Sequence, residues 1–292
     1  MREIAFGKYN GTGNDFVLIE DVEDRVSLDA GLIAAICDRH RGVGADGLIR
    51  VAPAEGADFF MDYYNADGRP SQMCGNGIRC LSKLAYERGL TDKRDLAIST
   101  RAGLKHVSLH VEDGRVDRVT VDMGAPSLRR GDLPMQGDPD SEFVAEPVDV
   151  DGRSFKGTGV SMGNPHLVLF VETDPSAVDV ERLGPILEHD PRFPEGTNVE
   201  FVATNEAGLS VRVWERGVGE TMACGTGACA SLVAAHLAGL APAHCEVRFP
   251  GGSLDIDWRR HQGGRVFMTG GVERSFEGVL EAEWLRQRGV TA

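Results

Sequence analysis

Apolar and polar residues alternate in short runs along the first half of the chain, a pattern that predicts strands. Such runs occupy residues 3–9, 15–20, 58–64, 95–100, 104–111 and 116–122. The last two are separated by Glu112-Asp113-Gly114, which predicts a hairpin turn. Apolar residues at helical spacing predict a helix over about 28–36 with Ser27 as its N-cap, and another from Gly77 that ends at Gly89.

The second half of the chain repeats this plan. Strands are predicted at about 143–150, 153–161, 167–171, 198–203, 209–215 and 264–270, and helices at 178–189 and 226–238. The helix at 226–238 is apolar nearly all round, which is typical of a helix buried on every side. We therefore expect a curved sheet to wrap around it. We expect residues 125–142, rich in Gly, Pro, Arg and Asp, to carry the chain between two domains.

The repeat is visible in the letters themselves. Cys74-Gly75-Asn76-Gly77 recurs as Cys224-Gly225-Thr226-Gly227, a shift of 224 − 74 = 150 residues. The same shift carries Gly13-Asn14 onto Gly163-Asn164. We predict an α+β fold of two pseudo-symmetric domains, each a curved, mainly antiparallel sheet around a central apolar helix. The predicted domains are residues 1–125 plus 271–292, and residues 126–270, with an active site in the cleft between them.

Composition narrows the class of protein. Apolar residues make up 41% and charged residues 26% of the 292 residues, which is globular. The net charge of −14 disfavours nucleic-acid binding, which normally needs a basic surface. The sequence has neither a signal-peptide pattern nor a run of 18 apolar residues, so we expect a cytoplasmic enzyme without a membrane partner. Its six cysteines are expected to be free thiols, and their spacings do not suggest a metal site.

Cys74 and Cys224 each stand just before a Gly-x-Gly that opens a predicted helix. The first N–H groups of a helix have no intrahelical partner and bind anions. The helix dipole should also lower the pKa of a nearby thiol. One helix start therefore offers both a cradle for a carboxylate and a reactive sulfur, and two starts that face each other would hold one carbon centre between two acid/base groups.

Other residues have both structural and functional interpretations. Asn14 and Asn164 are either turn residues or paired amides that line the cleft. Glu215-Arg216 is either surface charge or a grip on an amino-acid head group. His166 is either structural or a partner for a cysteine thiolate. Gly42-Val43-Gly44-Ala45-Asp46-Gly47 matches a dinucleotide motif in letters only, since it lacks the strand-to-helix setting, and we interpret it as a loop.

Together these segments closely resemble the diaminopimelate epimerase family over nearly the whole chain. The resemblance is carried by Gly11 through Phe16, Asp38 through Gly47, Asn65-Ala66-Asp67-Gly68, Met73 through Cys80, Met162 through His166, Arg192 through Asn198, Glu215 through Thr221, and Ala223 through Gly227. One departure is Gly47, where some members of the family carry a Gln that contacts the substrate.

The resemblance implies a two-base reaction that uses neither pyridoxal phosphate nor a metal. One cysteine removes the α-proton as thiolate and the other returns a proton to the opposite face. Backbone groups of Gly75, Asn76, Gly225 and Thr226 are implied to hold the reacting carboxylate. The resemblance implies further substrate contacts at Asn14, Asn65, Asn164, Asn198, Glu215 and Arg216. His166 and Glu215 are implied to tune the pKa values of the cysteines.

Three alternatives stay open. The nearest is a related cofactor-independent racemase acting on another amino acid. A cysteine hydrolase built on Cys74 and His166 would leave Cys224 without a role. A non-catalytic amino-acid-binding protein would bind without exchanging the α-proton. The expected partner is a small-molecule amino-acid substrate. The sequence does not decide the oligomeric state, for which a homodimer is one option.

Overall fold

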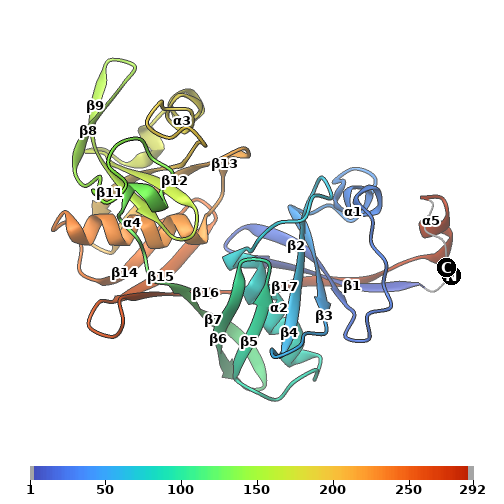
Figure 1. Cartoon of the computed structure of the whole chain (residues 1–292). Coiled ribbons are helices and arrows are strands. Elements are labelled where there is room, and N and C mark those ends of the chain that lie inside the picture. Colours follow the sequence, from blue (N-terminus) through green and yellow to red (C-terminus); the bar gives the residue numbers. More distant parts are fainter. Residues whose placement is uncertain (1–2, 289–292) are drawn as a thin grey trace. The chain divides into compact units, whose positions relative to one another are not determined.

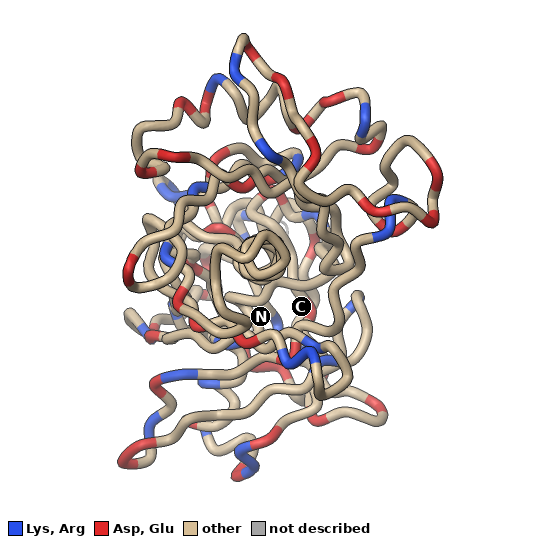
Figure 2. Tube along the Cα trace, turned by 90° about the vertical axis from the view of Figure 1, so that its left-hand side faces the viewer, with Lys and Arg blue, Asp and Glu red and all other residues tan. Residues whose placement is uncertain are grey.

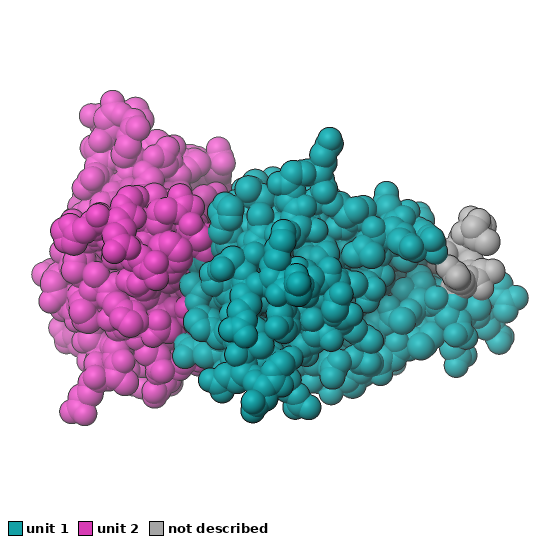
Figure 3. Space-filling model, turned by 90° about the horizontal axis from the view of Figure 1, so that it is seen from below, with its two compact units in different colours: residues 1–121, 270–292 teal, residues 122–269 magenta. Residues whose placement is uncertain are grey.

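The computed structural model describes residues 3–288, so the predicted end of the first domain at 289–292 lies outside it. The chain forms two compact units, unit 1 (residues 1–121 and 270–292, of which 3–121 and 270–288 are described) and unit 2 (residues 122–269) (Figure 3). It passes between them within β7 (Arg115–Gly124) and again within β16 (Arg265–Gly271).

Unit 1 is one sheet in the strand order β17-β1-β2-β3-β4-β5-β6-β7, in which β2–β3 and β4–β5 pair parallel. Its other strands are β1 (Ile4–Gly11), β2 (Asn14–Glu20), β3 (Gly47–Ala52), β4 (Phe59–Asn65), β5 (Asp95–Thr100), β6 (Gly103–Glu112) and β17 (Glu273–Leu280). Helix α2 (Gly75–Glu87) contacts β1, β2, β3 and β6, so the sheet must curve around it (Figure 1). Helices α1 (Ala30–Cys37) and α5 (Ala282–Arg286) complete the unit.

Unit 2 repeats this plan around α4 (Gly225–Leu237). Strands run in the order β8-β9-β10-β11-β12, and β10–β11 and β12–β14 pair parallel, as β2–β3 and β4–β5 do in unit 1. Helix α4 contacts β9, β10, β11, β12, β14 and β15. Figure 1 shows it alongside β11, β12, β14 and β15. The strands are β8 (Glu146–Val150), β9 (Arg153–Ser161), β10 (Pro165–Phe170), β11 (Asn198–Asn205), β12 (Gly208–Glu215), β13 (Gly219–Thr221), β14 (His244–Phe249) and β15 (Gly252–Arg259). The helical segments are η1 (Arg130–Asp132), η2 (Pro175–Ala177) and α3 (Val180–Glu188).

The duplicated α+β fold predicted from the sequence is therefore confirmed. Strand β17 pairs with β1 from Ile4↔Leu280 to Asn10↔Glu273, within unit 1. The hairpin after β6 is also confirmed: Asp113 and Gly114 both have positive φ, as a two-residue turn of that hand requires.

Some local predictions were wrong. Helix α1 is capped by Asp29, whose carboxylate accepts the N–H of Leu32 at 2.7 Å, and Ser27 lies two residues before this cap. Residues 125–142 belong to unit 2, where Leu133 and Met135 are anchored in the core. Strands β13, β14 and β15 were not predicted.

The described residues, 3–288, contain no helix with the length and apolar character needed to span a membrane. Lys and Arg are interspersed with Asp and Glu along the trace in Figure 2.

Candidate active site

Cys74 and Cys224 are the N-caps of the two central helices. Both have extended backbones, with φ of −136° and −126°, and each sulfur accepts a backbone N–H three residues on, from Gly77 or Gly227, at 3.4 Å. The helices begin at Gly75 and Gly225, one or two residues earlier than predicted, because the cysteine itself caps the first turn. Each unit thus presents one sulfur at a helix start, where N–H groups without an intrahelical partner can bind a carboxylate.

Asn14 connects Cys74 to a charged cluster in unit 1. Its Oδ1 accepts the Cys74 thiol at 3.6 Å, and its Nδ2 donates to Asp46 Oδ2 at 2.6 Å. Asp46 and Asp15 are both paired with Arg39 at 2.7 Å. Burial works against the charged form of Asp15, but hydrogen bonds from Arg39 and Lys8 outweigh it and lower its pKa to about 2. Asp15 is therefore ionised at neutral pH, and the hydrogen bond to Asp46 holds the Asn14 amide in one orientation.

Arg79 supports the start of α2 from within the core. Its side chain is fully buried, and Nη2 donates to Thr12 Oγ1 at 2.7 Å and to Asn76 Oδ1 at 3.1 Å. Its Nε and Nη1 have no partner in the described part of the chain, and burial lowers its pKa to about 10. Sequence reasoning missed Arg79, although a charged residue on the buried face of a helix was a visible signal.

Two further predicted positions of unit 1 lie where β3 and β4 pair. Gly47 stands opposite Asn65, whose side chain is exposed. A Cβ at Gly47 would lie 2.6 Å from the carbonyl oxygen of Tyr64 and 2.7 Å from the Tyr63 ring. A Gln at this position would require Tyr63 and the neighbouring backbone to move.

Unit 2 holds its cysteine in a longer hydrogen-bonded chain. Glu200 Oε1 lies 2.6 Å from His166 Nδ1, and both side chains are fully buried. His166 Nε2 lies 3.1 Å from Asn164 Oδ1. Asn164 Nδ2 donates to Thr226 Oγ1 at 3.4 Å, and Thr226 Oγ1 lies 3.4 Å from Cys224 Sγ. His166 therefore contacts Asn164 and Glu200, and of the two interpretations the direct pair with a cysteine is not the one observed. Glu200 was not predicted to take part.

The pKa of Cys224 differs from the expectation. Burial raises it well above its usual value, and the nearby carboxylates of Glu215 and Glu200 raise it further, while Thr226 and the N–H of Gly227 act in the opposite direction. The expected lowering was wrong for this cysteine, because a helix start contributes only about 0.3–1 kcal/mol while burial shifts a pKa by several units. Burial likewise raises the pKa of Glu215, which hydrogen-bonds Cys224 and accepts Thr221 Oγ1 at 2.5 Å.

Asn198 and Arg216 meet at the ends of β11 and β12. Asn198 Oδ1 accepts the backbone N–H of Arg216 at 2.9 Å, while its Nδ2 donates to Pro165 O at 2.8 Å. The Arg216 guanidinium donates to Glu195 O at 3.1 Å. The predicted residues therefore form two groups. Unit 1 holds Asn14, Asn65, Cys74, Gly75 and Asn76, and unit 2 holds Asn164, His166, Asn198, Glu215, Arg216, Cys224, Gly225 and Thr226.

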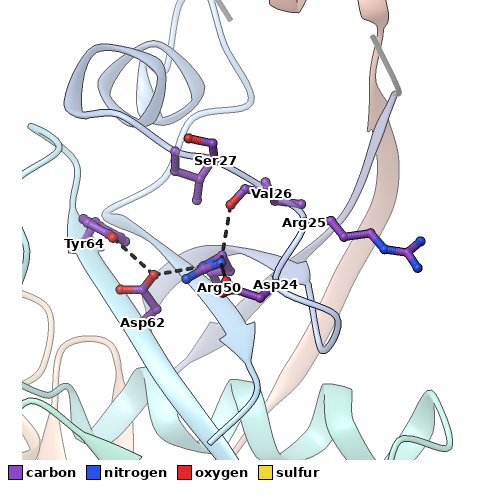
Figure 4. Close-up of a pocket in the computed structure, with 8 residues that line it drawn as sticks. Asp24, Arg25, Val26, Ser27, Arg50, Asp62 and Tyr64 are labelled. Carbon is purple, nitrogen blue, oxygen red and sulfur yellow. Dashed lines mark hydrogen bonds and ion pairs between the residues drawn. The ribbon is translucent and has the colours of Figure 1, made fainter. Parts of the chain in front are cut away.

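A pocket of about 350 Å³ in unit 1 lies apart from these residues (Figure 4). It is lined by Asp24, Arg25, Val26, Ser27, Leu28, Arg50, Asp62 and Tyr64. Arg50 occupies its centre and pairs with Asp24 and Asp62, and Tyr64 donates to Asp62. Arg50, Asp24, Asp62 and Tyr64 therefore satisfy one another within the pocket.

The fold defines a class of two-unit proteins with one central helix in each unit. The structure resembles a probable proline racemase from Agrobacterium radiobacter K84, with a TM-score of 0.69 over 96% of this chain and 93% of that one, at 14% identity. It also resembles methylitaconate-delta-isomerase, with a TM-score of 0.67 over 100% and 98% of the two chains, at 14% identity.

Sequence comparison identifies the family within this class. The diaminopimelate epimerase family model matches residues 6–129 and 158–275. The chain is 47% identical to the diaminopimelate epimerase of Moorella thermoacetica, over 94% of this chain and 98% of that protein. It is 43% identical to that of Acetivibrio thermocellus, over 95% and 99%. The chain belongs to the diaminopimelate epimerase family.

Proposed function

We propose that this chain interconverts LL- and meso-2,6-diaminopimelate by moving one α-proton between Cys74 and Cys224. The duplicated pair of cysteine-capped helices carries this proposal, because inversion at one carbon needs one acid/base group on each face. Membership of the family supports diaminopimelate as the substrate and a role in the synthesis of lysine and of the peptidoglycan precursor.

The helix starts supply the electrostatic part of the reaction. The N–H groups of Gly75 and Asn76 in one unit, and of Gly225 and Thr226 in the other, would hold the reacting carboxylate. The same donors would stabilise the negative charge that develops when the α-proton leaves, a contribution of about 3–4 kcal/mol for each donor when measured by removal. One cysteine accepts the proton as thiolate, and the other delivers a proton as thiol from the opposite face.

The second amino-acid head of the substrate needs a different set of contacts. We assign its carboxylate to Arg216, which offers two parallel N–H donors. Its ammonium group is assigned to Glu215, with Asn65, Asn164 and Asn198 as further contacts and Asn14 on the side of Cys74. The hydrogen bond from the Arg216 backbone N–H to Asn198 supports this assignment, since it fixes the backbone from which the Arg216 side chain extends. We assign the reaction to the cytoplasm, because no disulfide links the cysteines of the described residues.

The test is exchange at the α-carbon in heavy water. Wild-type protein should incorporate solvent deuterium into LL-diaminopimelate while meso-diaminopimelate accumulates. Cys74→Ala and Cys224→Ala should each lose epimerisation, and Cys245→Ala, which alters a cysteine on β14, should retain it. Full epimerisation by either of the first two variants would exclude the two-base scheme.

The same assay separates the alternatives. Faster turnover of proline or histidine than of diaminopimelate would favour a related racemase. Release of an acyl or amide product would favour a cysteine hydrolase. Binding without deuterium exchange would favour an amino-acid-binding protein.

A further inference from the structure

The two asparagines related by the 150-residue shift present opposite atoms to their surroundings. In unit 1, Asn14 donates through Nδ2 to Asp46 at 2.6 Å, so its carbonyl oxygen faces Cys74. In unit 2, the carbonyl oxygen of Asn164 faces His166 at 3.1 Å, so its NH₂ group faces Thr226. The pseudo-equivalent amides are therefore turned in opposite directions.

The orientation of Asn164 depends on the protonation of His166. An amide oxygen only accepts hydrogen bonds, so Nε2 of His166 must carry a hydrogen. The other ring nitrogen lies 2.6 Å from Glu200, and this contact holds one more proton, on Nδ1 or on the carboxyl group. Without Glu200, a neutral imidazole could place its hydrogen on Nδ1 and accept through Nε2, and the amide of Asn164 would then be free to turn.

The duplicated half shows that the fold does not need this buried pair. Phe16 matches His166 under the 150-residue shift. Phe16 pairs with Gly47 and His166 pairs with Asn198, so Ile49 and Glu200, each two residues further along the strand, occupy equivalent positions. Both also lie against the second glycine of the central helix: a Cβ at Gly77 would be 2.7 Å from Ile49, and one at Gly227 would be 2.7 Å from Glu200. Glu200 Oε2 has no hydrogen-bond partner among the described residues, which makes the carboxylate costly to bury.

We propose that Glu200 is a positioning residue: through His166 it fixes the NH₂ group of Asn164 toward Thr226, while Asp46 turns Asn14 the opposite way in unit 1. The hydroxyl of Thr226 then accepts from Asn164 and directs its own hydrogen to Cys224. Asn14 presents an acceptor to Cys74, whereas Thr226 presents a donor to Cys224 beside the carboxyl group of Glu215, so the half-sites are prepared for opposite steps of proton transfer. This inference rests on the proposed function for its catalytic meaning.

The charges around Cys224 give this donor its importance. The carboxylates of Glu215 and Glu200 lie near the Cys224 sulfur. Burial and these negative charges both disfavour the thiolate form of Cys224. His166 is the nearby basic group. The Thr226 hydroxyl and the N–H of Gly227 are the groups that offset them when the proton leaves. Losing the orientation of Asn164 would remove one of these two donors.

Direct measurement of the His166 ring tests the proposal without any substrate. Long-range ¹H–¹⁵N spectra of the full-length protein should show a proton on Nε2 of His166. An unprotonated Nε2 would overturn the proposal, since the amide of Asn164 would then have to face His166 with its NH₂ group.

Variants of Glu200 test its consequence for the reaction. Glu200→Ile should lower kcat roughly 10- to 100-fold, the usual effect of a misplaced catalytic group. Glu200→Gln should retain most activity, because its amide can donate to Nδ1 and leave the hydrogen on Nε2. Asp255→Asn is the matched control: it removes the carboxylate partner of the exposed His244 in the same unit and should change neither kcat nor KM.

The alkylation of each cysteine by iodoacetamide, followed by peptide mass spectrometry as a function of pH, supplies the second readout. In Glu200→Ile the profile of Cys224 should move to higher pH than in Glu200→Gln, and that of Cys74 should not change. If Glu200→Ile does not fold, His166→Phe combined with Glu200→Ile restores the apolar pair of unit 1 and should behave in the same way.

Equal losses in the Gln and Ile variants, or wild-type behaviour of the Ile variant, would overturn the proposal. A wild-type protein inactive on diaminopimelate would instead refute the proposed function, and the spectra and alkylation profiles would still decide the role of Glu200.

Discussion

The carboxyl group of Glu215 is a direct influence on the reactivity of Cys224. It hydrogen-bonds the sulfur, and its negative charge raises the pKa of the thiol. Glu215→Gln should therefore lower that pKa and speed alkylation of Cys224 by iodoacetamide at neutral pH, although epimerisation falls because the assigned ammonium contact is lost. Glu220→Gln, which breaks an ion pair with Arg212 on the neighbouring strand, is the control. Slower alkylation in Glu215→Gln would contradict the assignment.

Arg79 gives a second prediction at this scale. Two of its nitrogens have no partner in the described part of the chain, so its charge is costly to bury, and a buried charge is often replaced by an apolar residue with little loss of stability. Arg79→Met should therefore fold, but Asn76 and Thr12 lose their donor and KM for diaminopimelate should rise roughly tenfold. Urea unfolding and steady-state kinetics measure the two effects, with the exposed Arg248→Met as the control. A loss of more than about 3 kcal/mol with unchanged KM would mean that Arg79 serves stability alone.

At single positions, the sequence predicts where a residue lies on a helix or strand better than it predicts the burial and charges around its side chain. The two cysteines were expected at helix starts, because the Gly-x-Gly that follows each of them is a local signal. The pKa of Cys224 was not predictable, because the carboxylates that raise it come from Glu200 on β11 and Glu215 on β12. Burial and the approach of distant strands do not appear in the letters around position 224.

Among the elements, the start of α1 offers a clean comparison between the expected and the observed cap. Asp29 accepts the N–H of Leu32, so Asp29→Ala should reduce the free energy of unfolding by about 1 kcal/mol. Ser27→Ala removes the residue that the sequence first suggested and should have no measurable effect. Urea denaturation of both variants decides the point, and the reverse ranking would mean that the helix begins earlier in solution.

Among the elements, helix α4 was predicted, whereas strand β15 was missed in spite of a clear alternation and strand β13 for lack of one. Helix α4 is apolar nearly all round, and the sheet around it follows from the need to bury every face. Strand β15 was missed although Leu254, Ile256 and Trp258 are buried at every second position, which is an ordinary strand signal. Strand β13 has three residues and no apolar side chain, and it forms only because β12 pairs with it.

For the whole molecule, the duplication explains the fold, but one half does not predict every residue of the other. Both units keep the same pairs of parallel strands and the same cysteine-capped helix. They differ in what lies beneath that helix, Ile49 in unit 1 and Glu200 in unit 2. The repeated motifs therefore predict two half-sites of one geometry, while the different functions of the halves lie in residues that the repeat does not preserve.

Oxidation gives a prediction that involves both units together. If Cys74 and Cys224 approach one carbon atom from opposite faces, removal of substrate should let their sulfurs meet, and a mild oxidant should join them in a disulfide that inactivates the enzyme. Cys37, Cys80 and Cys229 are buried in the cores of their units, so they are not expected to form the disulfide. Peptide mapping under non-reducing conditions identifies the linked pair, and a thiol reductant should restore activity.

The control is Cys245→Ser, which should remain sensitive to the oxidant, because the half-buried thiol of Cys245 lies on β14 and takes no part. Full activity of the oxidised protein, or a linkage between other cysteines, would show that the two helix starts do not face one another.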